Sequence, residues 1–157
     1  RVQALAAAHT LLAERGWQEV ALDQIVRQQL NLLSSHRIAI EGPEVMVSSF
    51  VVQPLALVIQ ELLINATLHG VLSGAEGTLT IGWVALEDRG GFELTWEEAG
   101  GPAPPEIQRP GFGTAITRGM IEKQLRGTVR RNWTETGLIV TINVPTGRDP
   151  ARPATSA

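Results

Sequence analysis

The sequence predicts an α+β fold, a two-layer sandwich in which helices cover one face of a mixed, mostly antiparallel sheet. Helical periodicity dominates the first half of the chain, whereas segments that alternate on period two dominate the second half. Such segregation of helices and strands is typical of this layered class. With 157 residues, 43% of them hydrophobic, a single domain can bury a sizeable core.

The first half of the chain is expected to hold three helices and one pair of strands. Residues 1–14 and 21–33 place apolar residues at helical spacing, so each segment predicts an amphipathic helix. Residues 37–48 alternate apolar and polar side chains around the turn-forming EGPE, which predicts a β-hairpin. Residues 50–72 are apolar nearly all round a helix, as in a helix buried between layers, and Pro54 must lie near its start to avoid a kink.

The second half predicts four strands and one more helix. In order they are strands 78–86 and 91–99, an irregular segment 100–113, a helix 114–125, and a hairpin of strands 127–134 and 137–145. The irregular segment contains four prolines, which exclude regular structure. The polar tail 146–157 is expected to be disordered.

The composition bounds the class of protein. A net charge of −3 gives no sign of a broad nucleic-acid-binding surface. The absence of cysteine excludes disulfides and thiolate metal sites, and it suits an intracellular protein. No apolar run reaches about 18 residues without a polar interruption, so we expect no membrane span. The chain opens on RVQALAAAH without Met or a signal-peptide pattern, so we expect it to be part of something longer.

Two polar residues, Glu61 and Asn65, interrupt the apolar helix expected at 50–72. They are four positions apart, about one helical turn, so their side chains share a face. They could form an ordinary stripe that faces solvent. A buried carboxylate, however, needs a partner or a task such as general base catalysis, and a carboxamide oxygen suits a hard cation such as Mg²⁺.

The strand at 91–99 ends in acidic residues followed by two glycines, in the stretch WEEAGGPAPPE. An ordinary turn would explain this pattern. Alternatively, Glu98 accepts hydrogen bonds from a ligand amine, while Gly100 and Gly101 let the ligand approach the backbone. Of the four tryptophans, we place only Trp96 near such a site.

A glycine-rich stretch, GFGTAITRGM, leads into the last helix. Exposed N–H groups at a helix N-terminus can bind an anion, and Thr114 could cap this one behind Gly111 and Gly113. Six of the thirteen Lys and Arg residues lie nearby: Arg109, Arg118, Lys123, Arg126, Arg130 and Arg131. A charged face of the last helix and hairpin would explain the last four of them equally well.

In order, the chain has E-x-x-x-N on a long helix, W-x-E-x-G-G-P after a strand, and G-F-G before a helix. This order resembles the ATP-binding domain of sensor histidine kinases, within the GHKL superfamily. WEEAGGP and RVQALAAAHTLL are similar to elements of the HWE group of these kinases. The resemblance covers about residues 1–145 and implies a Bergerat-type ATPase sandwich. It divides the chain into the second helix of a dimerising, phosphoacceptor hairpin at 1–15, a catalytic domain at 16–145, and the tail.

The resemblance also implies residue roles. Asn65 would coordinate Mg²⁺ bridging the ATP phosphates, Glu61 would orient or deprotonate the attacking imidazole, and Glu98 would read adenine where the superfamily usually has Asp. Residues 103–110 would form a short ATP lid. The remaining binding residues would lie against adenine and the phosphates: Gly100, Gly101, Gly111, Phe112, Gly113 and Thr114.

Three positions depart from the family pattern. Gln60 stands where the HWE group has the His of its name, and Leu68 stands where the family commonly has a Lys. His69 occupies a position that is more often aromatic. His9 lies on the second helix of the expected hairpin and is not taken for the phosphoacceptor.

The function that the resemblance implies is transfer of the ATP γ-phosphate to a His on an upstream helix not present in this chain. It implies a cytoplasmic protein that is a homodimer at full length and signals to a response regulator, without nucleic-acid or membrane contact by these residues. Two alternatives stay open. One is a degenerate domain that serves as a phosphorelay adaptor or scaffold, and the other is a serine kinase of the anti-sigma type.

Overall fold

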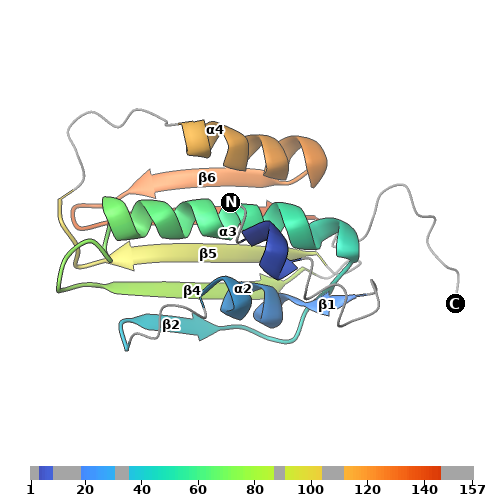
Figure 1. Ribbon diagram of the computed structural model, residues 1–157, viewed down its shortest axis with the longest axis horizontal. Helices are drawn as coiled ribbons and strands as arrows, with labels where there is room; N and C mark the ends of the chain where they lie inside the picture. Colours follow the sequence, from blue (N-terminus) through green and yellow to red (C-terminus); the bar gives the residue numbers. More distant parts are fainter. Residues whose placement is uncertain (1–3, 9–18, 31–35, 87–90, 104–111, 146–157) are drawn as a thin grey trace, which may run out of the picture.

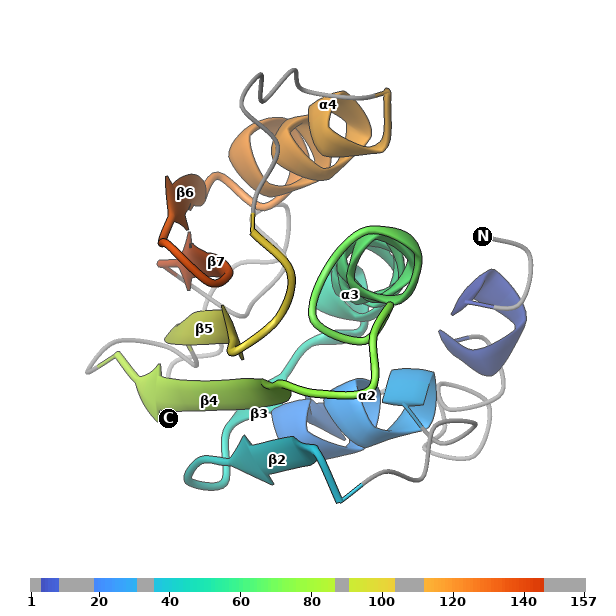
Figure 2. The same ribbon diagram turned by 90° about the vertical axis from the view of Figure 1, so that its left-hand side faces the viewer.

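The computed structural model describes residues 4–8, 19–30, 36–86, 91–103 and 112–145. In this part of the chain, helices cover one face of a five-stranded sheet, as Figure 1 and Figure 2 show from two directions. The predicted two-layer α+β sandwich is therefore confirmed.

The main sheet has the strand order β2-β4-β5-β7-β6. Its strands are β2 (Ile38–Glu41), β4 (Thr78–Ala85), β5 (Phe92–Ala99), β6 (Thr128–Trp133) and β7 (Leu138–Val144). β2 pairs parallel with β4, and every other pair in this sheet is antiparallel. Along β5 and β7 every second side chain is buried beneath the helices, as the period-two alternation predicts.

The predicted hairpin at residues 37–48 is wrong. β2 joins the main sheet beside β4, whereas β3 (Met46–Val47) pairs with β1 (Val20–Ala21) in a separate two-stranded sheet. Contacts from distant parts of the chain hold the segment between them. The Trp83 Nε1–H donates to the Pro43 carbonyl at 2.8 Å, and the Leu22 amide donates to the Val45 carbonyl at 2.8 Å. The local alternation identified two strands, but tertiary pairing separated them.

The long helix is α3 (Ser49–Leu68), which lies over the sheet, roughly parallel to its strands, and supplies ten buried residues. Pro54 is its sixth residue, close to the start as expected. The helix ends four residues earlier than predicted, and the Gly70 amide donates to the carbonyls of Asn65 and Ala66 at 3.0 and 3.2 Å. By length and composition alone α3 could cross a membrane, but here it is the central helix of the core.

The other helices agree with the sequence pattern within the described residues. Residues 4–8 are helical, and α2 spans Leu22–Leu30. The predicted helix at 114–125 is α4 (Phe112–Gly119), which continues as a π-helical segment, η1 (Met120–Gln124). The rest of the predicted first helix, most of the lid and the tail lie outside the described residues.

Candidate functional site

Glu61 and Asn65 lie on one face of α3, one turn apart. Glu61 is 7% exposed, so it does not belong to a stripe that faces solvent, and Asn65 is half-buried. Beyond them the helix surface opens to solvent, since Leu68 is 63% exposed and His69 is also exposed. We call Glu61 and Asn65 the helix wall.

Glu98 lies at the end of β5, beside the end of α3. It is 5% exposed, and its Oε1 accepts a hydrogen bond from Trp96 Nε1 at 3.2 Å. A β-carbon placed on Gly70 would stand only 2.7 Å from Glu98 Oε2, so the carboxylate fills the space next to that glycine. This packing brings the predicted adenine-reading residue to the same end of the molecule as the helix wall.

Burial dominates the electrostatics of Glu98. Loss of solvation raises the pKa of the carboxyl above its usual value. Hydrogen bonds from Trp96 and from the backbone of Val71, together with the positive charge of Arg131, oppose that rise in pKa. The ionised carboxylate is therefore held chiefly by neutral donors, and its remaining acceptor capacity suits an amine of a ligand.

The glycine pair after β5 packs against the loop that follows α3. Gly100 has φ +75°, a conformation that favours glycine, and a β-carbon on Gly101 would lie 2.8 Å from the Val71 Cα. The Gly101 amide donates to the Thr136 carbonyl at 3.0 Å. Backbone conformation thus accounts for Gly100 and close packing for Gly101, and their predicted approach to a ligand stays a prediction.

The start of α4 lies on the same side of the sheet as α3, and the two helices are in contact. Phe112, Gly113 and Thr114 form its first turn, and only their backbone is described. Gly111, Arg109 and almost the whole predicted lid lie outside the described residues. Figure 2 views this end of the molecule directly, with α4 above α3 and both helices to the right of β5, β7 and β6.

The strand register adds two residues that the sequence analysis did not place in the site, Arg131 and Trp133. Arg131 is opposite Val140, which is opposite Trp96, and both of these partners are fully buried on the helix-covered face. In the next row on that face, Trp133 and Glu98 flank Leu138. We call Glu98, Arg131 and Trp133 the sheet floor.

The two arginines in the middle of β6 therefore point to opposite faces. Arg130 is exposed on the outer face, whereas Arg131 is half-buried beneath the helices. Burial and the nearby charge of Arg118 lower the pKa of Arg131, and Glu98 partly offsets this. The alternation on β6 could have shown that the two arginines diverge, but not which of them faces the core.

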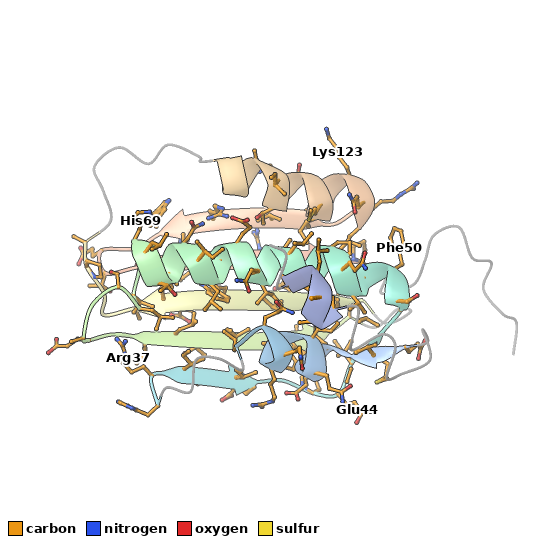
Figure 3. The ribbon with its side chains drawn as sticks, viewed as in Figure 1. Arg37, Glu44, Phe50, His69 and Lys123 are labelled. Atoms are coloured by element: carbon orange, nitrogen blue, oxygen red, sulfur yellow. The ribbon has the colours of Figure 1, made fainter. Side chains whose placement is uncertain are left out.

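Two tryptophans lie near Glu98, and only Trp96 was expected there. Trp96 is fully buried and reaches the site only through the hydrogen bond from its ring nitrogen to Glu98. Trp133 is 40% exposed at the end of β6, in the row of Glu98. Figure 3 shows His69 at the same end of the molecule, where α3 ends. Among the described residues, no group of three His, Cys, Asp or Glu side chains could hold a metal ion.

Comparisons with known proteins relate the chain to histidine kinases. A family model described as HWE histidine kinase matches residues 1–44. The blue-light-activated histidine kinase of Rhizobium johnstonii is 46% identical over 145 residues, which are 92% of this chain and 42% of that protein. One from Brucella anthropi is 34% identical over 154 residues, which are 95% of this chain and 31% of that protein. The chain thus spans less than half the length of these relatives.

Solved structures show the same fold. The histidine kinase domain of an Erythrobacter litoralis blue-light-activated histidine kinase matches with a TM-score of 0.74 at 20% identity, over 92% of this chain and 72% of that one. The nucleotide-free catalytic domain of histidine kinase ThkA matches with a TM-score of 0.63 at 18% identity, over 82% of this chain and 95% of that one. The chain is therefore similar to histidine kinases of the HWE group and has the fold of a histidine kinase catalytic domain.

Proposed function

We propose that this chain is the ATP-binding catalytic domain of a sensor histidine kinase, which transfers the ATP γ-phosphate to a histidine on a helix N-terminal to these residues. The observation that carries the proposal is the buried carboxylate Glu61, one turn from Asn65 on α3, at the end of the molecule where Glu98 closes β5. Residues more than 30 positions apart in sequence thus gather beside one helix end.

The residue roles follow from the chemistry of each group. Glu98 accepts a hydrogen bond from the amine of adenine, and Glu61 orients or deprotonates the attacking imidazole. The first turn of α4 offers backbone N–H groups to the phosphates. The remaining residues assigned to nucleotide binding are Asn65, Gly100, Gly101, Gly111, Phe112, Gly113 and Thr114.

The magnesium ion that accompanies ATP fits the helix wall. The Asn65 side-chain oxygen is a ligand suited to Mg²⁺, and the residue is only half-buried. When bound, the ion neutralises charge on the transferring phosphoryl group.

The proposal extends to the setting of the domain. The phosphoacceptor helix of the same protein and a response regulator are its protein partners, the full-length protein is a homodimer, and the domain is cytoplasmic. The relatives named above are longer than this chain, which leaves room in them for the acceptor helix.

Calorimetric titration with a non-hydrolysable ATP analogue tests the proposal. We expect the chain to bind the analogue more tightly with Mg²⁺ than with EDTA. Asn65→Ala should abolish the difference between the two conditions while keeping the fold. Absence of binding at millimolar ligand would end the proposal, and an unchanged magnesium effect in Asn65→Ala would remove that residue from its role.

A phosphorelay adaptor without transferase activity is the second candidate, because two positions on α3 depart from the family pattern. Leu68 is 63% exposed where a lysine could reach the phosphates, and Gln60 replaces the HWE histidine. Radiolabelled ATP added to the full-length protein separates the candidates. Acid-labile, base-stable label on the protein indicates a histidine kinase, bound ATP without label indicates the adaptor, and acid-stable label on a partner indicates a serine kinase.

A further inference from the structure

The chain has Leu68 where the family commonly has a lysine, yet the sheet floor contains a cation, Arg131. We infer, building on the proposed nucleotide site, that Arg131 binds the phosphates of the nucleotide from the sheet floor and takes the place of that lysine. Its guanidinium would then be a positioning group for the diphosphate part of ADP or ATP.

The first support is the position of Arg131 along the site. Glu98 packs against Gly70 at the end of α3, and Trp133 shares its row. Arg131 lies two residues before Trp133, which is about 6.7 Å along a strand. Because α3 and β6 run in the same direction in Figure 1, that distance corresponds to about one helical turn back from Gly70, at the level of Asn65.

The second support is that Arg131 is half-buried and has no hydrogen-bond or ion-pair partner among the described residues. Within the described residues, its guanidinium makes no hydrogen bond and no ion pair. A guanidinium has five N–H donors, and a charged group removed from water is unfavourable unless those donors are satisfied. An oxyanion that accepts two of them in parallel would satisfy this requirement.

The third support is the distribution of charge around Arg131. Arg118 in the last turn of α4 repels Arg131, and Glu98 on β5 attracts it, so a second cation and one carboxylate lie close enough to act on its guanidinium. Arg118 itself is exposed, and its Nε lies 3.9 Å from Oε1 of Glu122, which is one helical turn further along the chain. Two arginines close to each other favour an anion beside them, because its charge would offset their mutual repulsion.

The chain offers a matched control in Arg130. It is the adjacent residue on the same strand, it carries the same charge, and it is exposed on the opposite face of the sheet. Arg130→Gln and Arg131→Gln therefore change the net charge equally, and only the second removes a cation from the sheet floor.

The experiment measures the affinity of the whole chain for ADP by calorimetry and for adenosine by NMR titration. We expect Arg131→Gln to weaken ADP binding about tenfold to a hundredfold, as for loss of a charge-assisted hydrogen bond, and to leave adenosine binding within about twofold. Arg130→Gln should leave both unchanged. Arg131→Lys, which keeps the charge without the planar fork, should lie between the wild type and Arg131→Gln for ADP.

The outcomes separate this inference from the proposed function. If the wild-type chain binds neither ADP nor adenosine, both fail. If it binds ADP and Arg131→Gln binds equally well, only the role of Arg131 fails. If Arg131→Gln lost equal affinity for ADP and for adenosine, a contact between Arg131 and the phosphates would also be contradicted. Thermal unfolding establishes that each variant is folded, and if Arg131→Gln is not, Arg131→Lys carries the test, with a severalfold loss for ADP alone expected.

Discussion

The helix wall and the sheet floor of the site are built in different ways. Glu61 and Asn65 come from one helix and are four residues apart, so local geometry alone puts them on one face. Glu98 and Arg131 come from strands separated by β7, and only the register of two strand pairs brings them together. A helix wall can therefore be predicted from a short stretch of sequence, whereas a sheet floor needs the fold.

The difference also suggests a division of labour. In the helix wall, Glu61 is assigned to phosphoryl transfer and Asn65 to the magnesium ion, whereas the sheet floor holds the groups assigned to binding adenine and phosphate. Variants of Glu61 should then change the rate more than the affinity, and variants in the sheet floor should do the reverse.

The largest effect is expected at Glu61. In the full-length kinase, Glu61→Gln should slow autophosphorylation by about 10²–10⁴-fold, because a positioned general base contributes that much to proton transfer. The affinity for ADP should stay within about threefold. Glu97→Gln is the matched control, since Glu97 is an exposed carboxylate on the outer face of β5. An equal loss of rate and affinity would contradict the division between wall and floor.

Sequence patterns predicted most of the fold because its elements have strong local periodicity. The strands β4 to β7 and the long helix have nearly the expected bounds. The hairpin at 37–48 was wrong, because parallel pairing of β2 with β4 depends on a contact across 40 residues. No local rule contains that information.

The same limit explains what was missed in the site. Glu61, Asn65 and Glu98 could be proposed from motifs in which each residue stands in a recognisable local setting. Arg130 and Arg131 are adjacent and chemically identical, and only the pairing of β6 with β7 decides which one is buried. Trp96 was expected near the site, and its N–H does reach Glu98, although its ring belongs to the core.

An intermediate effect is expected where the wall and the floor meet. In Gly70→Ala the new β-carbon would stand 2.7 Å from Glu98 Oε2 and 2.9 Å from the Ala66 Cα, so the carboxylate or the helix end must move. We expect a loss of about 1–3 kcal/mol in the free energy of unfolding, as for other overpacked sites, and weaker ADP binding. Denaturant unfolding and calorimetry measure the two effects.

Gly74→Ala is the control for that substitution. Gly74 lies in the same loop, and a β-carbon there would meet no atom within 4 Å. The stability of Gly74→Ala should equal or slightly exceed that of the wild type, because alanine restricts the conformations of the unfolded chain. If both variants lost the same stability, the loop backbone and not the contact with Glu98 would be responsible.

The smallest effect on stability is expected from Glu98→Gln. The informative result is whether this substitution stabilises or destabilises the protein. Burial raises the pKa of Glu98 in the folded protein even though Trp96, Val71 and Arg131 oppose the rise. The folded state therefore binds a proton more readily than the unfolded state does. The contribution of Glu98 to stability is then fully present below its unfolded pKa, near 4.5, and is lost as pH rises through its higher folded pKa.

Glu98→Gln removes the buried charge and keeps an oxygen that can accept from Trp96. Since the raised pKa already includes the attraction of Arg131, the neutral side chain should be the more stable one at pH 7. A gain of roughly 1 kcal/mol would raise Tm by about 2–4 °C for a domain of this size. The gain should shrink as pH falls towards 4.5, while ADP binding at pH 7 weakens. If the difference in stability between Glu98→Gln and the wild type did not change with pH, the buried negative charge of Glu98 would not be its cause.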